Sequence, residues 1–464
     1  MHLKNYIGDR SFYRKLVVLL VPLVLQQSIS SVVNLLDNIM VGQLCQESLS
    51  AVAIVNQLIF VFNLSLFGAV SGASIFGAQY HGQGNAEGVR FSYRYRLWTG
   101  LILTMLGLVI LIPAGDSLIR MFLNQDATSS GDLALTFSEA QDYLRITLWG
   151  LLPFAFSTAL SSALRDTGET VTPMYASVLA ILTNALLNLL LIFGHLGMPE
   201  MGVRGAALAT VISRFVEALF LVVRSAMHRQ RYPFLRGAYR SPYIPRQIVR
   251  SIFITGTPLL INELLWSLGT TMINQAYSVR GLDAVSATNI CGTVWQIFSI
   301  IMMGMGSAIA ILLGQQLGAG RIEDARADSR RLTFVNLLAH IAMALIMVCF
   351  APLIPRMYNV SPSVQRITEQ LLLIAACALP FDATTHACYF TMRSGGKTLI
   401  TFVFDCGFTW GVNLLTAFCL ANYTSLSIVA IYALVQLGNV AKCIVGIFIV
   451  RSGIWLRSLT HQAE

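Results

Sequence analysis

The chain has 464 residues, of which 55% are hydrophobic and only 11% are charged, and its mean hydropathy is +0.67. Soluble domains carry roughly 25% charged residues, so the composition excludes a soluble domain and indicates a polytopic membrane protein. The net charge of +9 lies in short loops between apolar runs, without a basic face of stacked aromatic residues. This pattern favours the lipid bilayer over nucleic acid as the partner of the basic residues.

The apolar runs predict an all-α integral membrane protein with twelve transmembrane helices. The hydrocarbon core of a bilayer is about 30 Å thick, and a helix needs roughly 20 residues to cross it. The predicted spans are 14–38, 49–78, 96–114, 138–163, 171–194, 203–227, 248–277, 285–316, 331–352, 366–391, 398–420 and 426–450.

The basic residues predict the topology of these spans. One set of alternating loops holds 23 of the 31 Lys and Arg residues, the other set holds six, and Arg214 and Lys442 lie within predicted helices. Because loops rich in Lys and Arg stay in the cytoplasm, both termini are expected there. We therefore expect a multi-pass protein of the inner, or plasma, membrane.

A basic segment with three prolines, residues 228–247, predicts a cytoplasmic linker between an N-terminal lobe (1–227) and a C-terminal lobe (248–464). An internal repeat supports this division. A shift of 236 residues, without gaps, aligns pairs such as Pro22 with Pro258, Gln79 with Gln315, and Gly82 with Gly318. Two six-helix lobes related by a pseudo-twofold axis along the membrane normal are typical of secondary transporters.

Sequence motifs for enzymatic chemistry are missing. The chain has no Walker A sequence, HExxH, CxxC or GxSxG, and its seven histidines are scattered. These observations argue against ATP drive within the chain, an intramembrane hydrolase and a histidine metal site. We expect no enzyme activity and no cofactor.

Several stretches resemble the multidrug and toxic compound extrusion (MATE) family, in chain order and over essentially the whole length. They are Leu36-Asp-Asn-Ile-Met-Val-Gly42, Ser71-Gly-Ala-Ser-Ile-Phe-Gly-Ala-Gln-Tyr80, Ala163-Leu-Arg-Asp-Thr-Gly-Glu-Thr170 and Met392-Arg-Ser-Gly-Gly-Lys-Thr398. The resemblance implies two six-helix lobes around a central cleft. It also implies export of cationic or amphiphilic organic compounds in exchange for sodium ions or protons.

Two aspartates are the leading candidates for cation coupling. Asp37 ends an apolar run, where a charge is expensive unless it faces a cavity, a partner or an ion, or lies at the headgroup boundary. The resemblance identifies it with the acid of the family's first helix. Asp382 follows Leu379-Pro-Phe and resembles an acid of the bacterial branch; alternatively, it pairs with His386 one turn later.

Further candidates carry oxygen atoms within helices. Glu263 lies behind Pro258, although the glutamate of relatives is usually nearer Trp266. Asn184 and Asn188 lie at i and i+4 on one helix face, and Asn188 stands where many relatives have an aspartate. With Thr210 they can serve a cation or only hydrogen-bond between helices. Sodium is expected either at Asp37, Asn184 and Asn188, or at Glu263 and Asp382.

The remaining interior charges and rings complete the set. Asp405 is a further helix-interior acid with a possible coupling role, and Arg214 and Glu217 are spaced for an internal ion pair. Candidates for contacting a flat organic cation, or for packing alone, are Gln57, Trp266, Gln275, Trp295 and Tyr389.

Three function classes compete. The leading interpretation is a secondary active exporter, active as a monomer, whose carboxylates bind coupling cations and substrate in turn. A lipid-linked saccharide flippase of the same transporter superfamily would need a cationic cleft, whereas the interior charges here are mainly acidic. A passive channel or receptor is disfavoured by the repeat and by the asymmetric placement of the acids.

Overall fold

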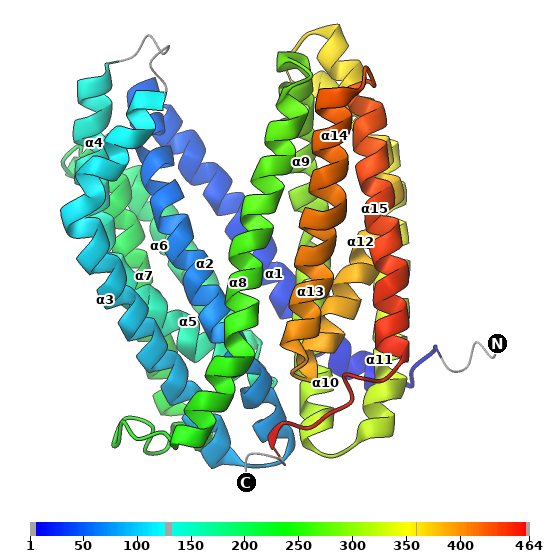
Figure 1. The fold of residues 1–464 in the computed structure, drawn as a ribbon. Helices are drawn as coiled ribbons and strands as arrows, with labels where there is room; N and C mark the ends of the chain where they lie inside the picture. Colours follow the sequence, from blue (N-terminus) through cyan, green and yellow to red (C-terminus); the bar gives the residue numbers. More distant parts are fainter. Residues whose placement is uncertain (1–5, 126–131, 359, 461–464) are drawn as a thin grey trace. The chain divides into compact units, whose positions relative to one another are not determined.

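The computed structural model describes residues 6–125, 132–358 and 360–460, with the backbone alone at 33–36, 38, 124 and 125. All regular secondary structure in these residues is helical (Figure 1). The first seven helices are α1 (Arg10–Gly42), α2 (Gln46–Gly82), α3 (Ala86–Gln125), α4 (Leu133–Thr147), α5 (Leu151–Asp166), α6 (Val171–Phe193) and α7 (Gly202–Met227). The others are α8 (Arg246–Ser278), α9 (Leu282–Phe298), α10 (Ile300–Gly318), α11 (Ile322–Phe350), α12 (Pro362–Ser394), α13 (Thr398–Phe408), α14 (Leu415–Tyr423) and α15 (Ile428–Arg451).

Within the described part of the chain, twelve helical segments are long and apolar enough to cross a membrane, which confirms the predicted number. Three predicted spans contain breaks. The span 138–163 is interrupted by a 3-10 segment, Leu148–Gly150, between α4 and α5. The span 285–316 is divided at Ser299 into α9 and α10, and a π-helical segment, Thr409–Leu414, separates α13 from α14. Most helices also extend beyond the predicted bounds, because polar first and last turns continue the helix outside the apolar run.

The chain forms two compact units whose segments alternate along the sequence. The N-terminal unit contains residues 25–77 and 86–249, and the described residues of the C-terminal unit are 6–24, 78–85, 250–358 and 360–460. Each unit is described separately below. The lobe boundaries expected from the sequence remain a prediction.

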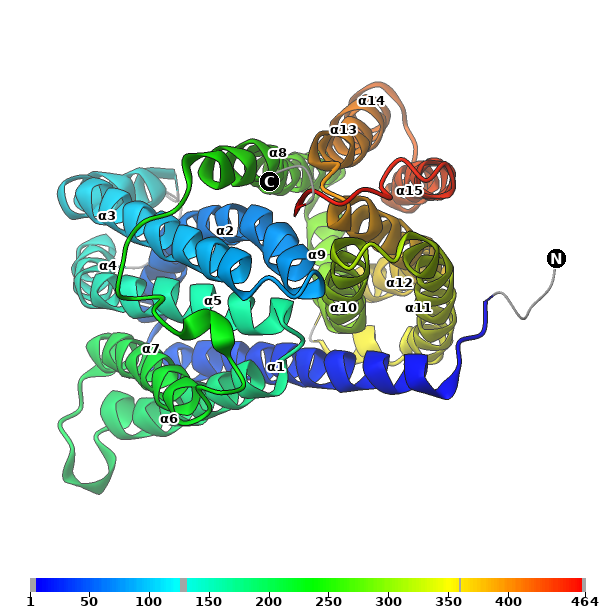
Figure 2. The ribbon, with the colours of Figure 1, turned by 90° about the horizontal axis from the view of Figure 1, so that it is seen from below.

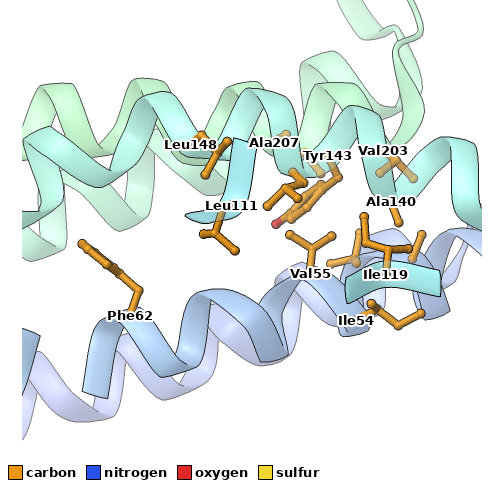
Figure 3. Close-up of a cluster of buried hydrophobic side chains, with 14 of the residues drawn as sticks. Ile54, Val55, Phe62, Leu111, Ile119, Ala140, Tyr143, Leu148, Val203 and Ala207 are labelled. Atoms are coloured by element: carbon orange, nitrogen blue, oxygen red, sulfur yellow. The ribbon is translucent and has the colours of Figure 1, made fainter. Parts of the chain in front are cut away.

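The core of the N-terminal unit is built from apolar side chains of α2, α3, α4 and α7. Val55, Ile119, Tyr143 and Ala207 are among its buried members (Figure 3). Helices α6 and α7 pack closely at Gly205. A Cβ at this position would lie only 2.5 Å from the carbonyl oxygen of Leu191, so the absence of a side chain is what allows the approach. Small residues at such contacts are the usual way for membrane helices to approach one another.

Helix α12 is the centre of the C-terminal unit and packs against α9, α10, α11 and α15 (Figure 2). The beginning of α1 belongs to the same core: Phe12, Leu16, Leu19 and Leu23 cluster with apolar residues of α10, α11 and α12. These four residues recur at spacings of three or four, so they form one apolar face of the helix.

The repeat predicted from the sequence is visible in a pair of glycine contacts within the C-terminal unit. A Cβ at Gly82 would lie 1.9 Å from the carbonyl oxygen of Gln315, and a Cβ at Gly318 would lie 1.9 Å from that of Gln79. These are the residues aligned by the 236-residue shift, and each contacts the counterpart of the other. Such reciprocal contacts are what a twofold relation produces.

The segment 228–247 is folded onto the N-terminal unit. Arg94 of α3 donates to three linker carbonyl oxygens, those of Gly237 (2.7 Å), Ala238 (2.9 Å) and Tyr243 (2.9 Å). The hydroxyl groups of Tyr93 and Tyr239 lie 2.7 Å apart, and burial raises the pKa of Tyr239. The centre of the linker is therefore hydrogen-bonded to the N-terminal part of α3.

Candidate functional site

Asp37, near the end of α1, lies beside the two asparagines of α6. The side-chain nitrogen Nδ2 of Asn188 donates to Asp37 Oδ1 at 2.6 Å and lies 3.3 Å from Asn184 Oδ1. Because Asn184 and Asn188 are one helical turn apart, both amides point to the same side of α6. The structure thus brings together three of the residues predicted for cation coupling.

Thr210 of α7 completes this group. In one orientation of its amide, Asn184 donates to Thr210 Oγ1 at 3.3 Å. With the amide turned over, Asn184 Nδ2 donates to both oxygens of Asp37, at 2.9 and 3.1 Å, and its oxygen accepts from Thr210. The second orientation gives each oxygen of Asp37 an amide donor and leaves Asp37 held by neutral groups from α6.

The oxygen Oδ1 of Asn188 is buried and has no hydrogen-bond partner among the described residues. A buried polar atom of this kind is costly unless a ligand or water satisfies it. Because the same amide donates to Asp37, this Asn188 oxygen, unsatisfied within the described part of the chain, lies close to the Asp37 carboxylate.

A cavity of about 440 Å³ opens next to these residues within the N-terminal unit. Its lining includes Asp37, Asn184, Asn188 and Thr210, and also Arg214, which the sequence indicated as a member of an ion pair. Three polar lining residues were missed by the sequence analysis: Asn56, Asn63 and Tyr143. Asn56 and Asn63 are seven apart, which places them on one face of α2 and could have identified them. No comparable spacing of polar residues in the sequence pointed to Tyr143. Gln57, proposed from the sequence, is exposed and is not part of this lining.

The nearby positive charge is already engaged. Arg214 lies 3.4 Å from Glu217, which confirms the predicted pair, and its guanidinium stacks 4.5 Å from the ring centre of Phe154. Glu217 also accepts from Ser177 (3.0 Å), which in turn accepts from Gln26 (2.7 Å). This chain of contacts joins α1, α6 and α7.

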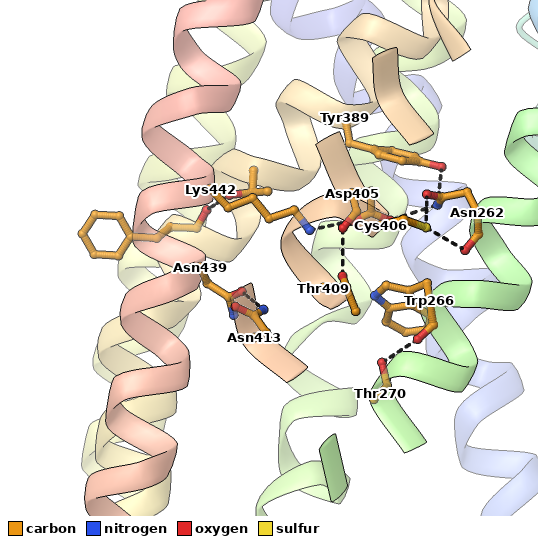
Figure 4. A network of polar contacts seen from close by, with 12 residues as sticks. Asn262, Trp266, Thr270, Tyr389, Asp405, Cys406, Thr409, Asn413, Asn439 and Lys442 are labelled. Carbon is orange, nitrogen blue, oxygen red and sulfur yellow. Dashed lines mark hydrogen bonds and ion pairs between the residues drawn. The ribbon is translucent and has the colours of Figure 1, made fainter. Parts of the chain in front are cut away.

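The C-terminal unit contains a second acidic cluster, around Asp405 of α13 (Figure 4). Lys442 of α15 contacts Asp405 Oδ1 at 2.5 Å, and Asn262 of α8 donates to Oδ2 at 2.9 Å. Asn262 also lies 3.4 Å from the hydroxyl of Tyr389 on α12. The pairing of Asp405 with Lys442 was not foreseen, because the two residues are 37 positions apart on different helices.

Glu263 and Asp382, predicted as an alternative sodium site, have different neighbours. Glu263 lies near Tyr389 and Arg393, whereas Asp382 lies near Lys442 and Asn439. No ion pair between Asp382 and His386 occurs among the described residues. The His386 imidazole instead lies 4.7 Å from the ring of Phe390.

Of the five residues proposed for substrate contact, Gln57 belongs to the N-terminal unit and the other four are dispersed in the C-terminal unit. Trp266 and Gln275 are exposed on α8, Trp295 is half-buried on α9, and Tyr389 is buried on α12. Of these, Tyr389 reaches the Asp405 cluster through Asn262. Their role in substrate binding remains a prediction.

The chain is similar to known protein sequences over most of its length. It is 27% identical to "Probable multidrug resistance protein NorM" of Thermotoga maritima, covering 92% of this chain and 90% of the relative. It is 26% identical to "Probable multidrug resistance protein YoeA" of Bacillus subtilis, covering 91% and 90%.

Solved structures show the same fold. A multidrug resistance MATE family transporter in an outward-facing conformation superposes with a TM-score of 0.84 at 23% identity, covering 97% of each chain. A transporter from Pyrococcus furiosus, described as having a binding pocket of reversed polarity, gives a TM-score of 0.79 at 23% identity and the same coverage.

The model of the MatE family matches the chain twice, over residues 22–190 and 258–419. The two matches begin 236 residues apart, at Pro22 and Pro258, which is the offset of the internal repeat. Together they cover more than half of the sequence. The chain therefore belongs to the MATE family of multi-pass membrane transporters, which are not enzymes.

Proposed function

We propose that this protein is a secondary active multidrug efflux transporter, which exports cationic or amphiphilic organic compounds by antiport with sodium ions or protons. The observation that carries the proposal is the Asp37 group, which consists of Asp37, Asn184, Asn188 and Thr210. There a carboxylate is held by neutral amides, the buried Asn188 oxygen has no partner among the residues that the structure describes, and a cavity adjoins both.

The donor set suits a small hard cation. Sodium prefers oxygen ligands, and Asp37, Asn184, Asn188 and Thr210 supply carboxylate, amide and hydroxyl oxygens from α1, α6 and α7. A proton on Asp37 would neutralise the same charge. The carboxylate can therefore exchange one cation for another, and the cavity beside it has room for an organic molecule.

The antiport step follows from this competition. A cation bound at Asp37 removes the negative charge that would attract a cationic substrate, and its release restores that charge. Substrate and coupling ion therefore favour opposite charge states of one carboxylate. An imposed ion gradient then drives the substrate outward.

The charges of the cavity support cationic rather than anionic cargo. Its charged lining residues are Asp37 and Arg214, and Arg214 is paired with Glu217. A flippase for lipid-linked saccharides would need surplus positive charge to bind a pyrophosphate group. That function remains the alternative.

The test is transport in proteoliposomes. A fluorescent organic cation should accumulate against its gradient when a sodium or a proton gradient is imposed separately, which identifies the coupling ion. Asp37→Asn should abolish gradient-driven accumulation. Asp142→Asn is the matched control, because Asp142 is paired with exposed Arg204 outside the cavity lining. Full coupled export by Asp37→Asn would contradict the proposal, and gradient-dependent movement of a lipid-linked saccharide in place of the dye would favour the flippase.

We also propose that the protein lies in the inner membrane as a monomer with both termini in the cytoplasm. The charge asymmetry of the loops supports this orientation. Arg240 is exposed in the linker, so Arg240→Cys in a cysteine-free background provides a reporter. The thiol should resist membrane-impermeant reagents in intact cells and react after lysis. Ready labelling of intact cells would reverse the orientation.

A further inference from the structure

Asp405 and Lys442 form a nearly buried ion pair whose members lie on different helices of the C-terminal unit. The side chain of Asp405 is 15% exposed and that of Lys442 is 10% exposed. Helix α13 carries the carboxylate and α15 the ammonium, and their contact is 2.5 Å long. Charges at membrane depth are rare and are normally paired or functional.

Both oxygens of Asp405 have a partner. Oδ1 contacts the ammonium, and Oδ2 accepts from Asn262 at 2.9 Å. The ammonium also lies 5.6 Å from the ring centre of Phe404, and Asp382 of α12 lies in its neighbourhood. The ion pair that the structure shows for Lys442 is the one with Asp405 of α13.

On the side of Asp405 away from the ammonium lie further oxygen-bearing side chains, those of Asn262 and Tyr389 (Figure 4). Asn262 Oδ1 accepts only a weak hydrogen bond from Cys406 Sγ, at 3.2 Å, and the Tyr389 hydroxyl lies near the same amide. Together with Asp405 they supply carboxylate, amide and phenol oxygens from three helices. Without the ammonium, these groups would surround an uncompensated negative charge.

We propose that Lys442 is a tethered cation, which occupies a monovalent-cation site at Asp405 and excludes sodium from it. The lysine side chain fills the position of an exchangeable ion with a charge that cannot leave. Removal of Lys442 alone should convert the cluster into a sodium site. For coupling, an implication that rests on the proposed antiport function, Asp405 then takes no part in ion exchange.

The experiment measures sodium binding rather than transport, so it stands apart from the test of the proposed function. The unfolding temperature of purified protein is recorded in sodium chloride and in choline chloride at equal ionic strength. All variants carry Asp37→Asn, so that the Asp37 group does not contribute. The variants to compare are Asp37→Asn alone, with Lys442→Met, with Lys442→Arg, and with both Lys442→Met and Asp405→Asn.

The Lys442→Met variant should gain a saturable, sodium-specific rise in unfolding temperature of about 2 °C or more over the Asp37→Asn parent. Folding of this variant in sodium but not in choline would also support the proposal. Lys442→Arg keeps the tethered charge and should show no gain, and Asp405→Asn should abolish the gain. The proposal is overturned if Lys442→Met folds equally well in both salts. It is also overturned if Lys442→Met fails to fold in either salt while the variant with both Lys442→Met and Asp405→Asn folds. A third contradicting result would be a sodium-dependent gain that survives Asp405→Asn.

Discussion

The Asp37 group and the Asp405 cluster solve the same problem differently. Each contains a helix-borne carboxylate that accepts a hydrogen bond from an asparagine, Asn188 at 2.6 Å and Asn262 at 2.9 Å. Asp405 then meets an ammonium from its own chain, whereas Asp37 meets neutral groups and a cavity of about 440 Å³. The charge of Asp405 is compensated permanently by Lys442, whereas compensation of the Asp37 charge depends on a cation that enters the cavity.

This difference separates a structural charge from an exchangeable one. A buried ion pair is held in place because removal of either partner leaves a charge uncompensated. A carboxylate held only by amides keeps its charge available to a proton, a metal ion or a cationic substrate. Hydrogen bonding alone therefore does not identify a coupling site. The distinguishing feature is whether a positive side chain of the protein already forms an ion pair with the carboxylate.

The largest effect is expected for Lys442→Met with Asp37 intact. In sodium-free buffer, loss of the ammonium leaves Asp405 uncompensated and should lower the free energy of unfolding by roughly 3–5 kcal/mol. Chemical denaturation in detergent measures this change. Lys442→Met with Asp405→Asn should recover most of the loss, and a double variant as unstable as the single one would show that the pair is not the cause.

The amides offer the next comparison. Asn262→Leu removes the donor to Asp405 Oδ2 and should lower the free energy of unfolding by about 1–3 kcal/mol, because a buried acceptor loses its partner. Asn188→Leu should instead mainly weaken cation binding at Asp37, measured by isothermal titration with sodium. Equal effects of the two substitutions on both measurements would remove the distinction between the sites.

An added carboxylate tests whether the Asp37 group binds sodium. Asn188→Asp places a second negative charge beside Asp37 and should raise sodium affinity by about tenfold, because affinity for hard cations grows with ligand charge. Radioactive sodium binding to purified protein measures the change. Asp142→Asn serves again as the control for a charge change outside the cavity, and unchanged affinity in Asn188→Asp would argue that no ion binds between α1 and α6.

The smallest effect is expected for Thr210→Val. Its hydroxyl is 3.3 Å from Asn184, so loss of a simple hydrogen bond would change stability by about 0.5–1.5 kcal/mol. If Thr210 is a cation ligand, sodium affinity should fall several-fold while stability in choline changes little. A fall in stability with unaltered sodium affinity would assign Thr210 to helix packing.

Sequence patterns predict those features that depend on short spacings. The twelve spans follow from apolar runs, Arg214 and Glu217 are three residues apart, and Asn184 and Asn188 are four apart. The association of Asp37 with the asparagines came from the family resemblance, not from spacing.

Other features depend on tertiary contacts that spacing does not encode. Asp405 and Lys442 each stood out as a charge within a helix, but nothing local indicates that α13 and α15 bring them together. The break at Ser299 lies within an apolar run without proline, so periodicity predicts one continuous helix there. The π-helical segment at Thr409–Leu414 likewise leaves no simple mark in composition.

A ribosome makes residues 6–24 before residues 25–249, yet residues 6–24 complete the core of a unit whose main part follows residue 249. Phe12, Leu16, Leu19 and Leu23 pack with side chains of α10, α11 and α12, which are made much later. At ordinary rates of synthesis, residues 25–249 take roughly 10 to 45 s to appear. During this interval the beginning of α1 lacks its final partners, so lipid or the insertion machinery must shield its apolar face. The unit can therefore close only after the chain has almost been completed.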